Sequence, residues 1–393
     1  MACLVSHPIQ YQVPLFRKIS QDPRFDLEVI YCSGKSTKSY LDQGFNREIN
    51  WDIPLMGGYR HIFLPKLFES THPSFFNPLS YGIYSILKKR NLDAIWIHGW
   101  SNWAQLSAII IARLLGIKVL IRGESGIHLK KPTGIKRVFR FIVMAFLKKT
   151  IDGFLAIGTN NKDYYLAHGI LPAKIFLVPY AVDNHFFLEQ SQNLTGDSLK
   201  IREKLTDNIE VTVILFSSKL ESRKRADFLI NAFAKLCNEY DLKNLPILLI
   251  IGDGSERPRI EKEITKMNLG NIFLLGFKNQ TELPMYYSMA DIFVLPSKQE
   301  PWGLVVNEVM NASCAVIVSD EVGCAKDLVD HGETGLVFSS DSEKELVNCL
   351  FELCSDIDKR NELALRAKER ITKWSYQEDM NGLHLALESL CSK

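Results

Sequence analysis

Short apolar runs alternate with longer amphipathic stretches along most of the chain. The clearest runs are VIYC near Val29, AIWIHG from Ala94, KVLIRG from Lys118, FLAIG from Phe154, VTVILFSS from Val211 and ILLIIGDG from Ile247. Runs of four to eight apolar residues bounded by turn residues are typical of buried strands, and strands that alternate with helices favour parallel sheets. The pattern therefore predicts an α/β protein with doubly wound, Rossmann-like sheets.

The chain is long for one domain, since 393 residues correspond on size alone to about two domains. We expect the boundary in VPYAVDNHFF, which gives an N-terminal domain at 1–182 and a C-terminal domain at 183–375. Near the end of the chain, helical spacing of Leu383, Leu387 and Leu390 predicts a final helix.

Two carboxylates lie in SKQEPWGLVVNEVMNASCAVIVSD, which covers residues 297–320. DIFVLPS before this stretch and AVIVSD at its end predict strands, and LVVNEVMNA predicts the helix between them. Glu300 falls in the loop at the carboxyl end of the first strand, where ligands bind in such units. Gly303 would let backbone amides at the helix N-terminus approach a phosphate. Glu308, about a turn and a half into the helix, is a bidentate acceptor suited to ribose hydroxyls.

The spacing of Glu300 and Glu308 resembles the Glu-x7-Glu signature of family 4, the retaining, nucleotide-sugar-dependent glycosyltransferases with the GT-B fold. FSSKLESRKRADFLINAF, at 216–233, is similar to the family segment whose two basic residues neutralise the donor diphosphate. Those positions are Lys219 and Lys224 here. A lysine stands at 219 where arginine is more usual, which keeps the charge but has less bidentate geometry. Further similar segments are IIGDGSERPRIE, IFLLGF and LVPYAVDNHFF.

The resemblance implies a GT-B architecture, in which two Rossmann-like domains face each other across a cleft. It implies that a helix at about 376–393 completes the N-terminal, acceptor-binding domain and that 183–375 binds the donor. The activity implied is metal-independent hexosyl transfer, with retention, to an acceptor hydroxyl of a sugar or lipid-linked molecule. Cell-surface polysaccharide or glycolipid synthesis is the expected role. No cofactor is expected, because the nucleoside-diphosphate sugar is itself the donor substrate.

On this resemblance the catalytic candidates are Glu300, Lys219 and Lys224, with Glu300 facing the transferring sugar. The donor-binding candidates are Glu308, Gly303, Leu304, Trp302, Lys278 and Gly252. Lys278 follows a strand and would lie beside the nucleobase, although a surface loop is the alternative. Gly252, in the GDG turn, could approach the nucleotide or simply form the turn.

Five residues of the N-terminal half are acceptor or cleft candidates: His7, Gln10, His98, Arg122 and Glu124. His7 and Gln10 follow the first strand in SHPIQYQ, where related enzymes carry a glycine-rich loop, and they either line the active site or shape a turn. His98 either faces a ligand or is a buried imidazole, with Trp100 and Trp103 as possible stacking faces. Arg122 and Glu124 either bind a sugar or form a local ion pair.

The composition of the chain bears on its partners, its compartment and metal binding. A net charge of +2 implies no global field for nucleic acid, which we do not expect as a partner. Eight scattered cysteines without a CxxC pair suggest buried thiols in a reducing cytosol. The N-terminus MACLVSHPIQ is typical of a strand and lacks signal-peptide features. We expect no metal site, since the Asp356–Asp358 pair falls in a charged, helical-looking stretch.

The segment 130–149 combines the apolar run FIVMAFL with seven basic residues, and it is too short to span a membrane. Its pattern fits a core-packing helix with a solvated basic face, and it fits equally a basic amphipathic helix on anionic lipid. The cysteines and the N-terminus lead us to expect a cytoplasmic protein. The segment 130–149 adds possible peripheral contact at the inner face of the membrane. A nucleotide-sugar epimerase, a phosphorylase and an inactive donor-binding module remain alternatives to the transferase.

Overall fold

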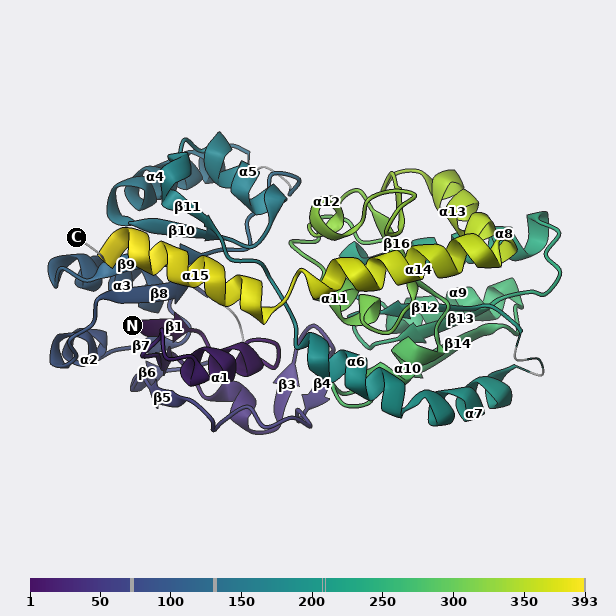
Figure 1. Ribbon diagram of the computed structural model, residues 1–393, viewed down its shortest axis with the longest axis horizontal. Helices are drawn as coiled ribbons and strands as arrows, with labels where there is room; N and C mark the ends of the chain where they lie inside the picture. The colour runs from purple at the N-terminus through teal and green to yellow at the C-terminus, as the bar shows by residue number, and fades with distance from the viewer. Residues whose placement is uncertain (71–73, 130–132, 207, 209, 392–393) are drawn as a thin grey trace. The chain divides into compact units, whose positions relative to one another are not determined.

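The computed structural model describes residues 1–70, 74–129, 133–206, 208 and 210–391 (Figure 1). The chain forms two compact units. Unit 1 comprises Met1–Tyr40, Ile53–Tyr180 and Tyr376–Lys393, and unit 2 comprises Leu41–Asp52 and Ala181–Ser375.

Unit 1 is built on a seven-stranded parallel sheet in the described part of the chain. The strand order is β11 (Ile175–Leu177), β10 (Gly153–Ala156), β9 (Lys118–Arg122), β8 (Ala94–His98), β1 (Ala2–Val5), β2 (Glu28–Tyr31) and β5 (Arg60–Phe63). Strands β1 and β2 are buried along their whole length, as expected when helices cover both faces of a parallel sheet. The chain leaves β1 towards β2 and leaves β8 towards β9, so the winding direction reverses between β1 and β8.

The helices of unit 1 are α1 (Val13–Gln21), α2 (Ile83–Lys89), α3 (Trp103–Leu114), α4 (Ile135–Thr150), α5 (Thr159–Ala167) and α15 (Tyr376–Cys391). Single 3-10 turns η1 and η2 lie at Lys35–Thr37 and Pro172–Lys174, and β6 (Lys66–Phe68) pairs antiparallel with β7 (Leu79–Ser80). A capping box starts α3, because Asn102 and Gln105 each accept a hydrogen bond from the other's backbone N–H, which satisfies two amides at the helix N-terminus.

Unit 2 is built on a six-stranded parallel sheet in the described part of the chain. Its order is β14 (Ile272–Gly276), β13 (Ile247–Ile251), β12 (Val213–Ser217), β15 (Ile292–Leu295), β16 (Ala315–Ser319) and β17 (Leu336–Phe338). Here the winding reverses between β12 and β15. Each of these two strands is buried along its whole length and pairs with a strand on both sides, so neither is an edge strand.

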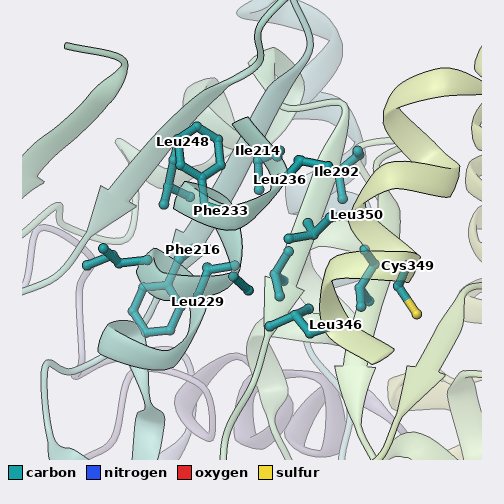
Figure 2. Close-up of a cluster of buried hydrophobic side chains, with 14 of the residues drawn as sticks. Ile214, Phe216, Leu229, Phe233, Leu236, Leu248, Ile292, Leu346, Cys349 and Leu350 are labelled. Atoms are coloured by element: carbon teal, nitrogen blue, oxygen red, sulfur yellow. The ribbon is translucent and has the colours of Figure 1, made fainter. Parts of the chain in front are cut away.

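The helices of unit 2 are α6 (Asn184–Asn193), α7 (Thr195–Leu205), α8 (Ala226–Glu239), α9 (Arg257–Met267), α10 (Leu283–Met289), α11 (Leu304–Met310), α12 (Ala325–Leu328), α13 (Glu343–Ser355) and α14 (Ile357–Thr372), with a 3-10 turn η3 at Ser222–Lys224. Figure 2 shows the core on one face of the sheet, where alternate strand residues such as Ile214, Phe216 and Leu248 pack against Phe233 of α8 and Leu350 of α13. The intervening strand residues are also buried, so helices cover the opposite face too.

Segment 41–52, which includes the end of β3 (Tyr40–Asp42) and β4 (Arg47–Ile49), belongs to unit 2 although the sequence places it within the first domain. Phe45 packs edge-on against Phe277 with ring centroids 4.9 Å apart, and Asp52 accepts a hydrogen bond from the backbone N–H of Thr281. These contacts explain why the division differs from the predicted range 1–182. The other boundary lies at 180/181, two residues before the predicted one.

The α/β class and the two parallel sheets confirm the predicted fold class. Every apolar run that predicted a strand forms one, namely β2, β8, β9, β10, β12, β13, β15 and β16, and LVVNEVMNA contains α11. Among the described residues, no helix is both long and apolar enough to cross a membrane.

A buried ion pair fixes α15 to the sheet of unit 1. Arg122, at the end of β9, donates to Asp379 at 2.7 Å, and the two side chains are 2% and 0% exposed. The guanidinium also donates to the carbonyl oxygens of Val178 and Pro179. Helix α15 comes so close to β11 that a Cβ on Gly382 would lie 1.9 Å from the carbonyl oxygen of Leu177, so only glycine fits. Burial raises the pKa of Asp379, although Arg122 favours the ionised form.

We predict that Asp379→Leu and Arg122→Met each lower the free energy of unfolding by about 3 kcal/mol, because each leaves one charge buried without its partner. The double variant should lose less than either single variant, since it leaves no such charge. Urea unfolding followed by circular dichroism measures this, with Glu362→Ala at the surface pair Glu362–Arg366 as the control that changes little. Additive losses in the double variant would show that the pair is not coupled.

Candidate functional site

The candidate donor residues gather at one edge of the sheet of unit 2. All six strands are parallel, so their carboxyl ends lie at the same edge, and the loops that follow them carry the candidates. Lys219 and Lys224 follow β12, Gly252 follows β13, Lys278 follows β14 and Glu300 follows β15. Strands β12 and β15 are neighbours and flank the reversal of winding direction, the position at which open α/β sheets bind ligands.

Glu300 lies in a cluster with two cations. Its Oε2 accepts hydrogen bonds from Lys224 Nζ and from Arg223 Nη1, the latter at 2.8 Å. Glu300 is 7% exposed and Lys224 8% exposed, and burial lowers the pKa of Lys224 despite the nearby carboxylate. The contact joins the loops after β12 and β15 across the reversal point. Arg223 also donates from Nε to Glu221 Oε2 at 3.2 Å, so the two cations and the two carboxylates of this cluster balance.

The backbone around Glu300 is held by hydrogen bonds to the loop that follows β16. Its N–H donates to the carbonyl oxygen of Glu321 at 3.1 Å, and its own carbonyl oxygen accepts from Gly323 at 2.9 Å. The carboxylate of Glu321 also accepts from the backbone N–H of Gln299, whose φ is +52°. This set of bonds fixes the position of the Glu300 carboxylate.

Glu308 lies in α11 as predicted, and it is half-buried. Its Oε2 accepts a 2.7 Å hydrogen bond from the hydroxyl of Tyr287, and the side chain of Gln280 bonds to the same carboxylate. Burial raises the pKa of Glu308 to about 7, although both hydrogen bonds favour the ionised form. Near neutral pH the side chain therefore divides between an acceptor and a donor of hydrogen bonds.

The two lysines that were predicted as a pair bind different carboxylates in this structure. Lys219 Nζ donates to Asp42 Oδ1 at 2.9 Å and lies over the ring of Phe45, 4.6 Å from its centroid. Burial alone would raise the pKa of Asp42, but Lys219 and the backbone N–H groups of Phe45 and Gly44 hold that pKa below its usual range. The Lys219–Asp42 pair is therefore neutral overall.

Three donor-binding candidates surround the start of α11. Gly303 has φ +96°, in the left-handed region that glycine favours, and a Cβ there would lie 3.1 Å from side chains of Leu295 and Val322. Leu304 begins the helix and is half-buried. Trp302 is buried, donates from Nε1 to Asn307 at 2.9 Å and stacks on Trp374. Trp302 therefore supports the loop from within the unit.

The other two donor candidates lie in the loops that follow the neighbouring strands β13 and β14. The N–H of Gly252 donates to the carbonyl oxygen of Gly276, and a Cβ at Gly252 would lie 1.8 Å from the carbonyl oxygen of Ser218. Because Gly252 has no side chain, the loop after β12 can pass close to its backbone. Lys278 lies 3.5 Å from Glu282 and over the ring of Tyr286.

The N-terminal candidates lie at the corresponding edge of unit 1. His7 and Gln10 follow β1 and His98 ends β8, so they flank the reversal of winding in this sheet. A turn bond from Gln12 N–H to the Ile9 carbonyl oxygen encloses Gln10, and the side chain of Gln12 bonds to Nδ1 of His98 at 3.2 Å. Burial holds the pKa of His98 well below its usual range, so the imidazole is neutral.

Arg122 and Glu124 do not pair with each other. Arg122 is the buried partner of Asp379, a contact between residues 257 positions apart. The exposed Glu124 accepts a 2.5 Å hydrogen bond from the hydroxyl of Tyr180. Of the two tryptophans, Trp103 is 41% exposed at the start of α3, and Trp100 packs against Gly123 so closely that a Cβ there would clash.

Among the residues that contact the candidate carboxylates and lysines, and that the sequence did not single out, are Arg223, Tyr287 and Asp42. Arg223 had a local signal, since it adjoins Lys224 in SRKR. The other two had none, because Tyr287 is 21 residues from Glu308 and Asp42 is 177 residues from Lys219. Asp356, considered above for metal binding, caps α14 by accepting from the N–H of Lys359.

The known proteins that this chain resembles include glycosyltransferases. Residues 197–370, most of unit 2, match the family described as glycosyl transferases group 1. An uncharacterised glycosyltransferase of Methanocaldococcus jannaschii is 28% identical over 251 residues, which cover 62% of this chain and 65% of that protein. Alpha-D-kanosaminyltransferase of Streptomyces kanamyceticus is 28% identical over 275 residues, covering 68% of this chain and 69% of the relative.

Solved structures extend the likeness to the whole chain. The Anabaena protein HepE, solved in complex with UDP, superposes with a TM-score of 0.73 at 16% identity, over 99% of this chain and 100% of that one. Identity at this level shows a shared fold. Residues 197–370 are therefore similar to group 1 of the glycosyl transferases, and the chain as a whole has the two-domain GT-B fold.

Proposed function

We propose that this glycosyltransferase transfers a sugar from a nucleoside-diphosphate sugar to an acceptor hydroxyl, with retention of configuration and without a metal ion. The observation that carries the proposal is the gathering of Glu300, Glu308, Lys219 and Lys224 on the loops and the helix that follow β12 and β15. Carboxylates suit sugar hydroxyls, and ammonium groups suit a diphosphate.

In the proposed reaction the bond between the anomeric carbon and the diphosphate oxygen breaks, and the acceptor oxygen bonds to the same face of that carbon. The acceptor proton passes to a donor phosphate oxygen. Lys219 and Lys224 stabilise the negative charge that develops on the leaving diphosphate, which favours the transition state over the bound donor. Glu300 orients the transferring sugar, and Glu308 accepts hydrogen bonds from the ribose.

The charges of the site support this assignment once Asp42 is considered. The cluster of Glu300, Arg223, Lys224 and Glu221 is neutral overall, and so is the Lys219–Asp42 pair. A donor diphosphate carries two negative charges, whereas the paired side chains supply no net compensating charge. Exchange of Asp42 for a phosphate oxygen at Lys219 would raise the local charge to +1. We propose that donor binding includes this exchange.

The acceptor is proposed to be a sugar or lipid-linked molecule of cell-surface polysaccharide or glycolipid synthesis. His7, Gln10, His98 and Glu124 remain the candidates for contacting it. The UDP bound to HepE makes UDP-sugars the first donors to test.

The first prediction concerns turnover. With one of a panel of UDP-, GDP- and ADP-sugars, in EDTA and with lipid extract as acceptor, the protein should release nucleotide. Glu308→Ala should lower that release about 100-fold, since charged hydrogen bonds contribute about 1.5–3 kcal/mol each. Glu333→Ala, an exposed carboxylate of unit 2, is the matched control and should change little.

The same assay separates the alternatives. An epimerase would convert the donor without acceptor, a phosphorylase would require inorganic phosphate, and an inactive module would bind a donor without releasing nucleotide. Loss of activity in EDTA, restored by a divalent cation, would contradict the assignment of charge neutralisation to the lysines. If no donor binds, the proposed function is wrong.

The second prediction concerns pH. Because the pKa of Glu308 is about 7, its carboxylate form rises from about a tenth of the molecules at pH 6 to about nine tenths at pH 8. Donor affinity should therefore increase about tenfold over this range, measured by calorimetry with an intact nucleotide sugar, whose diphosphate does not titrate there. Glu308→Gln should bind weakly and show no such slope. An unchanged slope in that variant would assign the titration to another group.

The third prediction tests the exchange at Lys219. Asp42→Asn should tighten donor binding about fivefold, because it removes a competing carboxylate from a partly exposed lysine. Asp241→Asn, an exposed residue of unit 2, is the control that should leave affinity unchanged. Weaker donor binding by Asp42→Asn would mean instead that Asp42 positions Lys219.

A further inference from the structure

Helix α4 of unit 1 has apolar residues on two faces. Towards the sheet, Met144 is 4% exposed and Leu147 is fully buried in the core. A second set lies at the helical spacing i, i+3, i+4 and i+7, and its members Ile135, Val138, Phe139 and Ile142 are 85%, 58%, 67% and 59% exposed. Phe141 beside them is 74% exposed. The helix therefore packs in the core and also has an exposed apolar face, which a core-packing helix with a solvated basic face would not have.

The charges around this face have one sign. From Ser125 to Ile151 the sequence contains seven lysines and arginines and no aspartate or glutamate, in a chain whose net charge is only +2. Two of the seven, Lys130 and Lys131, lie outside the described residues. The side chains of Arg137 and Arg140 make no hydrogen bond or ion pair with any residue that the structure describes. Their charges are thus available to an anionic partner.

Two cavities adjoin the same helix. One of about 530 Å³ is lined by Ile127, Leu129, Arg137, Arg140 and Phe141, among others. A second, of about 380 Å³, is lined by Leu106, Phe139, Arg140 and Val143, among others. Both include Arg140 and Tyr164. Apolar walls with an unpaired guanidinium suit a molecule that has an anionic head and a hydrocarbon chain.

We propose that α4 docks on the surface of an anionic phospholipid bilayer. The exposed apolar face enters the boundary between headgroups and acyl chains, and Arg137 and Arg140 contact headgroup phosphates. A second copy of this chain is a poor occupant of the face, because two such basic surfaces repel each other. The proposal goes beyond the transferase activity and does not depend on it.

Vesicle co-sedimentation with the full chain tests the proposal. The protein should sediment with vesicles of phosphatidylglycerol and phosphatidylcholine, bind at least tenfold more weakly to phosphatidylcholine alone, and be released by salt. The variant Phe139→Ser/Phe141→Ser should lose at least tenfold in binding. Arg137→Gln/Arg140→Gln should lose about fivefold per charge on the mixed vesicles only. Leu365→Ser, 59% exposed on α14, is the control and should bind as the wild type does.

Donor binding in solution should be unchanged in all of these variants. Unchanged donor binding would show that the variants fold, and it would separate the docking proposal from the transferase function. The docking proposal is overturned if the wild type does not bind the mixed vesicles at low salt, or if the serine and glutamine variants bind them as the wild type does. Self-association that the serine substitutions abolish, without vesicle binding, would identify a second copy as the occupant instead.

Discussion

The parallel direction of the strands in unit 2 is the constraint on which the candidate site depends. Parallel pairing places every carboxyl end at one edge, and the reversal between β12 and β15 sends the two following loops to opposite sides of the sheet. Residues from distant parts of the chain can meet there without a local motif. The contact between Lys224 and Glu300, 76 residues apart, joins those two loops.

Burial gives the carboxylates of this edge different properties. Glu300 is matched by two cations, so its charge is compensated before a ligand arrives. Glu308 has only neutral hydrogen-bond donors, and burial therefore raises its pKa to about 7. Two acidic side chains eight residues apart thus have different surroundings, one paired with cations and one bound by neutral hydrogen-bond donors.

The sequence alone predicts those features that depend on residues close together in the chain. The strand runs and the helix after Gly303 follow from local spacing, whereas Glu300, Glu308 and Lys224 were chosen with the help of the family resemblance. The structure places these three residues on the loops and the helix that follow β12 and β15. The partners could not be predicted in this way. Asp42 reaches Lys219 and Asp379 reaches Arg122 only through tertiary packing, and a single sequence does not record which distant residues meet. The exposure of Ile135 and Phe139 also depends on which face of α4 the core covers.

The ion pair between Arg122 and Asp379 joins two residues that are 257 positions apart in the order of synthesis. Unit 2 uses residues no later than Ser375, whereas the sheet of unit 1 receives its carboxylate partner from α15, after all of unit 2 has been made. During translation, the first half of the chain must hold an arginine whose counter-ion does not yet exist. The first unit to begin synthesis is therefore the last to be completed.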